Sequence, residues 1–173
     1  MYADVRLQHI GIVQLKQIRL SMNTPETFDF KFYEWEEKFR DKPFLKQPFG
    51  DEWEIYTWGE VGQYARKLAT GLRSLGLREN AHIGLISKNC REWIIADLAI
   101  VMAGYISVPF FPNLTSGEIN KLLTFGDVDL LFAGKVEDWE EQKAGVPEGM
   151  PIISFPTYKG CSDITEGHQW FDF

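Results

Sequence analysis

Residues 82–110 read HIGLISKNCREWIIADLAIVMAGYISVPF, and this stretch decides the fold class. The apolar run Ile83–Ile86 predicts a buried strand, and Ile106–Phe110 predicts a second one. The mostly apolar segment Arg91–Ala103 between them is long enough for a helix, and Gly104 lies where a helix C-cap belongs. A strand, a helix and a strand in this order predict a βαβ unit with parallel strands.

The same alternation continues toward the C-terminus. Thr115-Ser116-Gly117-Glu118 is a capping box, in which side chains of the first and last residue satisfy backbone N–H groups, and it predicts a helix that ends at Gly126. Asp129–Ala133 and Pro151–Phe155 predict two more strands, with a short helix between them at Glu137–Lys143. We therefore predict the α/β class, with layered parallel-sheet βαβ units and right-handed crossovers.

Three elements are predicted before this region. Phe28–Phe39 is typical of an amphipathic helix with one aromatic face, and Trp53–Thr57 alternates like a short strand. A second capping box, Thr57-Trp58-Gly59-Glu60, begins the best-marked helix, which ends at Gly76. The aromatic face of the first helix is predicted to consist of Phe28, Phe32, Trp35 and Phe39.

The helix predicted at Arg91–Ala103 is apolar on almost every side, and such a helix is normally covered all round. We expect a chain of 173 residues to supply only one of the two covers. Ile95 and Val101 are assigned to the uncovered side. An exposed apolar patch of more than roughly a few hundred Å² is an interaction or aggregation surface, so self-association through this patch is expected.

The composition excludes several functions. The chain has 18 Lys and Arg against 25 Asp and Glu, a net charge of −7, which argues against a nucleic-acid partner. Its two cysteines, Cys90 and Cys161, are too few for a disulfide scaffold and fit a reducing compartment, so we expect a cytoplasmic protein. No His or Cys pair has metal-ligand spacing, and no segment approaches the ~20 apolar residues of a transmembrane helix.

Residues 1–22 are interpreted as an N-terminal extension without clear periodicity. Arg6, His9, Lys16 and Arg19 interrupt every candidate apolar region, which argues against a signal peptide. Met22 precedes a turn-like Asn-Thr-Pro and is an alternative start of translation.

Several single residues are candidates for chemistry, each with a structural alternative. Cys90 lies at a predicted helix N-terminus, which lowers a thiol pKa, yet a buried cysteine is more often a small apolar residue. Ser87-Lys88-Asn89 follows a strand at the sheet edge where α/β proteins bind ligands, with Asn89 as a helix N-cap in the structural alternative. The carboxylates of Glu137–Glu141 are interpreted as a solvated face. Trp35, Trp53, Trp58 and Trp93 are interpreted as core and strand-face residues.

The order of the residues carries a resemblance to a known family. Five runs follow one another: Tyr56–Val61 (YTWGEV), Gly71–Leu77 (GLRSLGL), Asn89–Trp93 (NCREW), Ala103–Pro109 (AGYISVP) and Glu118–Leu123 (EINKLL). In this order and spacing they resemble the N-terminal region of the adenylate-forming (AMP-binding) ligases, closest to the long-chain fatty-acid–CoA ligases, the acyl-CoA synthetases.

The resemblance implies an acid–thiol ligase that uses ATP, Mg²⁺ and coenzyme A (CoA). In that family a carboxylate, here of a fatty acid, attacks the α-phosphate of ATP to give an acyl-adenylate and pyrophosphate, and the CoA thiol then displaces AMP. The phosphate loop and the catalytic lysine of the family lie downstream of the matched residues. Residues 23–173 are therefore interpreted as an incomplete N-terminal part of the AMP-binding domain, a scaffold segment without catalytic residues that is inactive alone.

The resemblance also implies one ligand contact. In acetyl-specific relatives the loop after the "VP" strand lies beside the CoA nucleotide, and this loop is here Pro112-Asn113-Leu114-Thr115. Those relatives place an arginine a little downstream, where this chain has Trp139, and that departure argues against the contact. The structural alternative is a turn with Thr115 as a helix N-cap.

Two other functions stay open at this point. An amino-acid- or aryl-acid-activating domain belongs to the same superfamily, although the NCREW pattern and the aromatic-rich start favour the fatty-acid branch. The alternative from another class is a non-catalytic α/β docking or regulatory module. A reading frame that continues past Phe173 would favour the enzyme segment, and a stop codon there would favour the module.

Overall fold

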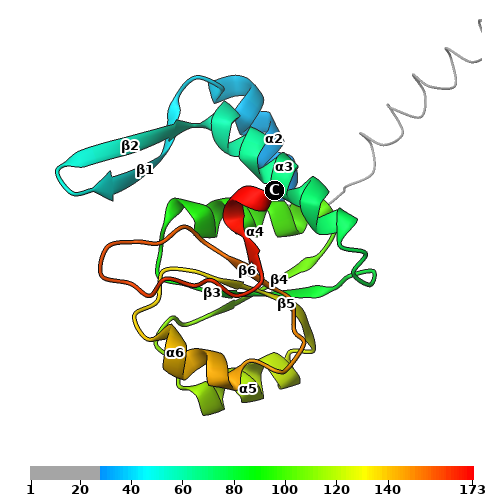
Figure 1. The fold of residues 1–173 in the computed structure, drawn as a ribbon. Coiled ribbons are helices and arrows are strands. Elements are labelled where there is room, and N and C mark those ends of the chain that lie inside the picture. The colour runs from blue at the N-terminus through cyan, green and yellow to red at the C-terminus, as the bar shows by residue number, and fades with distance from the viewer. Residues whose placement is uncertain (1–27) are drawn as a thin grey trace, which may run out of the picture.

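A computed structural model of the chain describes residues 28–173, so the predicted extension 1–22 and its boundary lie outside the described residues. At the centre is a parallel sheet with the strand order β4-β3-β5-β6-β7 (Figure 1). This sheet confirms the predicted α/β class. Its strands are β3 (His82–Ile86), β4 (Ile106–Phe110), β5 (Val128–Ala133), β6 (Ile152–Ser154) and β7 (His168–Gln169).

Helices cover both faces of the sheet (Figure 1). On one face lies α4 (Arg91–Ala103), with α3 (Trp58–Ser74) and α2 (Phe28–Phe39) packed over it. On the other face lie α5 (Ser116–Phe125) and the short α6 (Trp139–Gln142). Both predicted capping boxes, at the N-termini of α3 and α5, are present.

The prediction that α4 lacks one cover is wrong. The sheet lies under one side of the helix, and α3 and α2 cover the other, so that no residue of α4 is exposed. Ile95, assigned to the uncovered side, is 3% exposed, and Val101 is half-buried. The second cover comes from α2 and α3, which precede the sheet in the sequence.

The aromatic face predicted for α2 is only partly correct. Phe32 is fully buried, but Trp35 is 41% exposed. The buried position one turn after Phe32 is Glu36, whose carboxylate accepts two hydrogen bonds of 2.7 Å from Arg66 on α3. A charged residue can occupy this buried position because a paired and hydrogen-bonded carboxylate is far less costly to bury than a lone one.

A β-hairpin projects beside α2 and α3 (Figure 1). Its second strand, β2 (Glu52–Thr57), was predicted, whereas its first strand, β1 (Pro43–Phe49), was not. Gln47 of β1 is buried, and its side-chain oxygen accepts a 3.3 Å hydrogen bond from the backbone N–H of Arg91, at the start of α4. This bond joins the hairpin to the N-terminus of the central helix.

Among residues 28–173, strand β4 forms one edge of the sheet. The N–H of Ile106 donates to the carbonyl of Ala81 at 2.9 Å, which places it on the side of β3. Because successive N–H groups of a strand point to opposite sides, the nitrogen of Pro109 lies on the outer edge, where it has no hydrogen to donate. Of the three positions after Ile106, only Ser107 therefore offers an outward N–H.

Candidate functional site

The loops after β3 and β5 meet at the carboxyl edge of the sheet. β3 lies between β4 and β5, and the helices that follow β3 and β4 cover opposite faces. The point where the chain changes direction in this way is where open α/β sheets bind ligands. Ser87, Lys88 and Asn89 follow β3, and Lys135 lies in the loop after β5.

These two loops are bonded to each other. The N–H of Lys88 donates to the carbonyl of Lys135, and the N–H of Lys135 donates to the Ser87 hydroxyl, both at 3.0 Å. The Lys88 ammonium lies 2.6 Å from a carboxylate oxygen of Glu137. Ser87 is buried, and its hydroxyl donates to the carbonyl of Lys88 at 2.7 Å. The polar groups at this edge therefore close the gap between the loops, which supports their structural interpretation.

Two predictions for this edge are wrong in detail. The N-cap of α4 is Cys90 and not Asn89, and the Cys90 side chain makes no capping hydrogen bond. Burial, with a further contribution from the Glu92 carboxylate, raises the pKa of the Cys90 thiol to about 11, although a helix N-terminus was expected to lower it. The thiol is thus protonated at neutral pH, as expected of a small apolar core residue.

A buried charged cluster, which no local sequence pattern indicated, lies beside this edge. Glu92 is 2% exposed, accepts a 2.6 Å hydrogen bond from Nε of Arg91 and accepts another from the Tyr158 hydroxyl. The Arg91 guanidinium also pairs with Glu54 of the hairpin and lies 5.1 Å from the Phe49 ring centre and 4.8 Å from that of Tyr56. The cluster ties β1, β2, α4 and the segment after β6 together.

The cluster shifts the protonation of its members. Burial and the neighbouring Glu92 carboxylate raise the pKa of Tyr158 well above its ordinary value. Burial alone would lower the pKa of Arg91, but the carboxylates of Glu92 and Glu54 outweigh it and raise the pKa. Arg91 therefore stays charged and Tyr158 neutral over the physiological range, which fits a role in holding these elements together.

The loop that was predicted to lie near CoA, Pro112–Thr115, is held by its backbone. The side-chain amide of Gln142 donates to the carbonyls of Pro112 (2.8 Å) and Leu114 (3.1 Å). Thr115 is the N-cap of α5, as the structural alternative predicted. The exposed side chain of Asn113 makes no hydrogen bond within residues 28–173, and the ring of neighbouring Phe111 is 77% exposed.

The acidic run after β5 lies on the surface, as predicted. Glu137 and Glu140 are mostly exposed and pair with Lys88 and Lys143. Trp139 within this run is 1% exposed, and its indole N–H donates to Glu166 at 2.9 Å. A buried indole therefore occupies the position at which acetyl-specific relatives were expected to have an arginine.

Residues 28–173 contain no cluster of His, Cys, Asp and Glu side chains that could hold a metal ion. No helix in the same part of the chain is both long and apolar enough to cross a bilayer. Within the described residues the sheet edge thus combines hydrogen-bonded loops, a neutral thiol and a charge cluster.

Solved structures with this layered arrangement identify the fold. The anthranilate CoA ligase AuaEII, in complex with anthranoyl-AMP, superposes with a TM-score of 0.68 at 19% identity, covering 82% of this chain and 26% of that chain. A luciferase-like enzyme from the mealworm Zophobas morio gives a TM-score of 0.67 at 20% identity, covering 84% of this chain and 34% of that one. The fold is therefore that of the adenylate-forming ligases.

Sequence comparison identifies the family. The AMP-binding enzyme family matches residues 32–166, and the chain belongs to this family. The long-chain-fatty-acid–CoA ligase ACSBG2 of Rattus norvegicus is 25% identical over 156 residues, which are 87% of this chain and 23% of that protein. The 4-coumarate–CoA ligase 1 of Solanum tuberosum is 31% identical over 135 residues, 75% of this chain and 24% of that protein. The chain thus spans about a quarter of the length of these two relatives.

Proposed function

We propose that the chain is the N-terminal scaffold segment of an ATP-dependent fatty-acid–CoA ligase. The observation that carries the proposal is the family match over residues 32–166, combined with relatives named long-chain-fatty-acid–CoA ligases in Drosophila melanogaster and Rattus norvegicus and a long chain acyl-CoA synthetase in Arabidopsis thaliana. At 25–29% identity, these relatives support the class of reaction more strongly than the chain length of the acid.

The proposed reaction has two steps. An oxygen of the fatty-acid carboxylate forms a bond to the α-phosphorus of Mg²⁺-bound ATP, and pyrophosphate leaves. The thiolate of CoA then forms a thioester with the acyl carbon, and AMP leaves. The chain described here contributes the folded layers behind these steps, and we propose that it is inactive alone because its 173 residues contain no phosphate-binding loop motif.

We propose that the loop Pro112–Thr115 lies on the CoA side of the complete enzyme. Its fixed backbone and the unbonded Asn113 amide support a contact with the base of a nucleotide, beside the exposed ring of Phe111. The neighbouring carboxylates of Glu118 and Glu141 disfavour a contact with phosphates, because like charges repel. The loop therefore suits the neutral part of the coenzyme better than its charged part.

Two finer properties belong to this proposal. The free cysteines Cys90 and Cys161 support the expected cytoplasmic location, because reducing compartments keep thiols unpaired.

Self-association is proposed to use exposed side chains other than those of α4, which is covered. The outer face of the hairpin offers Trp53 and Ile55, which are 62% and 49% exposed.

A second candidate function is supported by a specific observation. The 31% identity to a 4-coumarate–CoA ligase and the likeness in fold to an anthranilate CoA ligase favour an aryl acid as the substrate. Both candidates share the adenylate chemistry and differ only in the acid. A non-catalytic docking module remains the alternative from another class.

The test is to express the whole open reading frame and measure ATP–pyrophosphate exchange with palmitate, octanoate, 4-coumarate and anthranilate. Exchange that depends on a fatty acid, followed by acyl-CoA and AMP formation, supports the first candidate, and exchange only with the aryl acids supports the second. Release of ADP and phosphate would exclude both. Exchange by the 173-residue chain alone would contradict the proposal that it is only a scaffold segment.

A further inference from the structure

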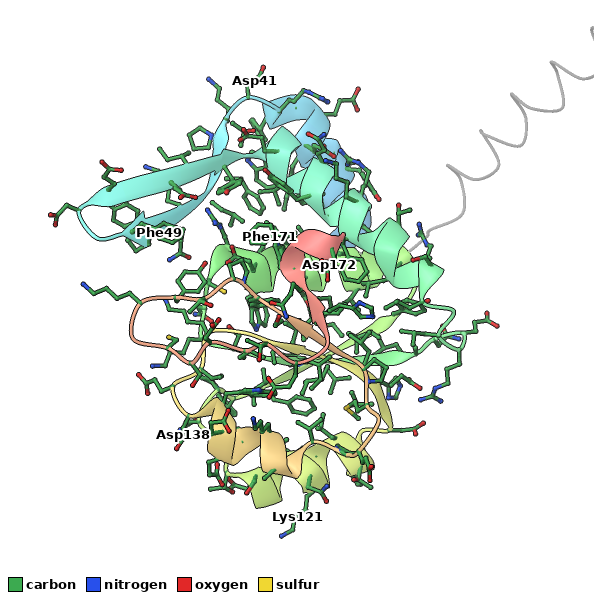
Figure 2. The ribbon with its side chains drawn as sticks, viewed as in Figure 1. Asp41, Phe49, Lys121, Asp138, Phe171 and Asp172 are labelled. Atoms are coloured by element: carbon green, nitrogen blue, oxygen red, sulfur yellow. The ribbon has the colours of Figure 1, made fainter. Side chains whose placement is uncertain are left out.

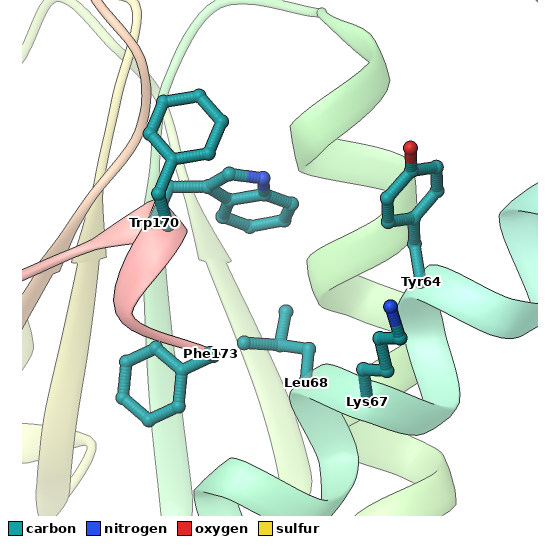
Figure 3. Close-up of a pocket in the computed structure, with 6 residues that line it drawn as sticks. Tyr64, Lys67, Leu68, Trp170 and Phe173 are labelled. Carbon is teal, nitrogen blue, oxygen red and sulfur yellow. The ribbon is translucent and has the colours of Figure 1, made fainter.

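A pocket lies between α3 and the 3₁₀ turn η2 (Trp170–Asp172) near the C-terminal end, outside the loops described above (Figure 3). Its volume is about 140 Å³. Trp170 and Phe173 lie on one side and Tyr64 and Lys67 on the other (Figure 3). The residues that line it are Tyr64, Lys67, Leu68, Trp170, Phe171 and Phe173.

The aromatic wall of the pocket is held from behind. The indole of Trp170 packs edge-on against Phe155, with 5.2 Å between ring centres. Phe173 packs edge-on against His168 at 5.7 Å, and its ring lies so close to Gly71 of α3 that a Cβ there would come within 2.1 Å of it. These contacts position the rings before any ligand arrives.

The polar side-chain groups of the pocket are all hydrogen-bond donors without an acceptor in the described residues. They are the Lys67 ammonium, the Tyr64 hydroxyl and the Trp170 indole N–H, and none of the three has a hydrogen bond or ion pair within residues 28–173. All three can donate a hydrogen bond, and no Asp or Glu side chain lines the pocket. The nearby carboxylate of Asp172 is used otherwise, because it accepts a 2.8 Å hydrogen bond from the backbone N–H of Gln169.

We propose that this pocket binds a small aryl carboxylate. The aromatic and aliphatic wall suits a flat apolar body, and the three hydrogen-bond donors suit an anionic acceptor, with Lys67 as the partner of its charge. The size agrees with this class, since an apolar cavity of about 150 Å³ accommodates one benzene ring.

The pocket continues toward the charged cluster. A smaller adjoining space of about 70 Å³ is also lined by Tyr64, Trp170 and Phe171, and it reaches Tyr56 and Arg91. Arg91 already pairs with Glu92 and Glu54, so it does not compete for the carboxylate. Lys67 is the lining cation without an ion pair in the described residues, which places the carboxylate of the ligand at the α3 side.

Isothermal titration calorimetry of the 173-residue chain with 3-phenylpropionate, without ATP or CoA, tests the inference. We expect saturable binding at one site and binding at least tenfold weaker for the neutral 3-phenylpropionamide. K67M should weaken binding of the acid at least tenfold. K121M is the matched control, because Lys121 is an exposed lysine of α5 on the far side from Phe171, and it should stay within twofold (Figure 2).

A second variant tests the contribution of the aromatic wall separately from that of the Lys67 charge. Trp170→Leu should weaken the acid and the amide to the same extent, because it removes aromatic wall and keeps Lys67. The proposal is wrong if wild-type protein shows no saturable heat, if K67M binds as tightly as wild type, or if acid and amide bind equally well. Since no ligase substrate pair is present, none of these results depends on the proposed enzymatic function.

Discussion

The carboxylate of Glu92 is buried between two donors, Arg91 and Tyr158. A buried charge is tolerated only while its partners are present, because each lost hydrogen bond leaves an unsolvated group behind. At this residue scale the stability of the fold depends on a few polar contacts that join distant parts of the chain.

Removing the Tyr158 hydroxyl should therefore be costly. For Tyr158→Phe we expect a loss of about 1–3 kcal/mol in the free energy of unfolding, as is usual when a buried acceptor loses a donor. Urea denaturation followed by circular dichroism measures the change. The control is Tyr105→Phe, because the hydroxyl of this half-buried tyrosine makes no hydrogen bond within the described residues. Equal effects of the two variants would contradict the assigned role of Tyr158.

Asp129 makes the fold sensitive to acid. Burial alone would raise its pKa, but hydrogen bonds from Arg78 (2.8 Å) and from the backbone N–H of His82 (2.8 Å) outweigh it and hold the pKa below the ordinary value. A carboxylate with a lowered pKa in the folded state stabilises the fold above its unfolded pKa of about 3.9, and this stabilisation is lost as the pH falls through the folded value.

We thus expect the free energy of unfolding to fall as the pH is lowered from 5 to 3. Asp129→Asn should lower stability at pH 7 and flatten this pH dependence, and urea titrations at several pH values would show both effects. Asp41→Asn is the control, because it changes an exposed carboxylate without an ion pair in the described residues, and it should leave the stability at pH 7 unchanged. An unchanged profile in Asp129→Asn would refute the assignment.

Residue-level predictions from sequence succeeded where the partners are local. The two capping boxes join residues three positions apart, and both are present. The cap of α4 was missed because its first N–H group, that of Arg91, is bonded to Gln47, which lies 44 residues earlier in the sequence. The pKa of Cys90 was predicted in the wrong direction because burial depends on packing that no local pattern reveals.

At the scale of elements, α4 is the helix around which the layers assemble. It lies between the sheet and the pair α2 and α3, and its N-terminus is hydrogen-bonded to the hairpin. The regular strands and helices from residue 82 to residue 133 were predicted closely, because their apolar runs and caps are continuous. β1 was missed because Pro43, Lys46 and Pro48 disrupt its alternation, and its strand form depends on pairing with β2. β7 was also missed, because a strand of only two residues is too short to form a recognisable pattern.

The two-sided cover of α4 predicts the effect of a charge there. Ile95→Lys should destabilise the 173-residue chain by more than about 3 kcal/mol or prevent folding, because it buries an unpaired ammonium. Leu122→Lys on α5 is the control, since Leu122 is 39% exposed and should tolerate the charge. Thermal denaturation would separate the two, and a stable Ile95→Lys chain would mean that one side of α4 is open.

At the scale of the whole molecule, the remaining exposed apolar side chains lie on several elements. Trp53 and Ile55 share the outer face of the hairpin, while Phe125 at the end of α5 is 92% exposed. We expect concentration-dependent self-association that the double variant Trp53→Ser, Ile55→Thr reduces and Phe125→Ser does not. Sedimentation velocity, with ANS binding as a second readout, measures this. A wild-type monomer at all concentrations that binds no dye would contradict it.

The proline at the open edge of β4 bears on how the whole molecule behaves in a crowded solution. An edge strand with regularly spaced outward donors can template the stacking of identical chains into fibres. Pro109 interrupts those donors, so Pro109→Val should convert ISVPF into an uninterrupted β-forming run that polymerises on agitation and binds thioflavin T. The same substitution at Pro151, just before the inner strand β6, should leave the protein fibre-free. The absence of an N–H group at Pro109 would then prevent the sheet from extending into neighbouring molecules.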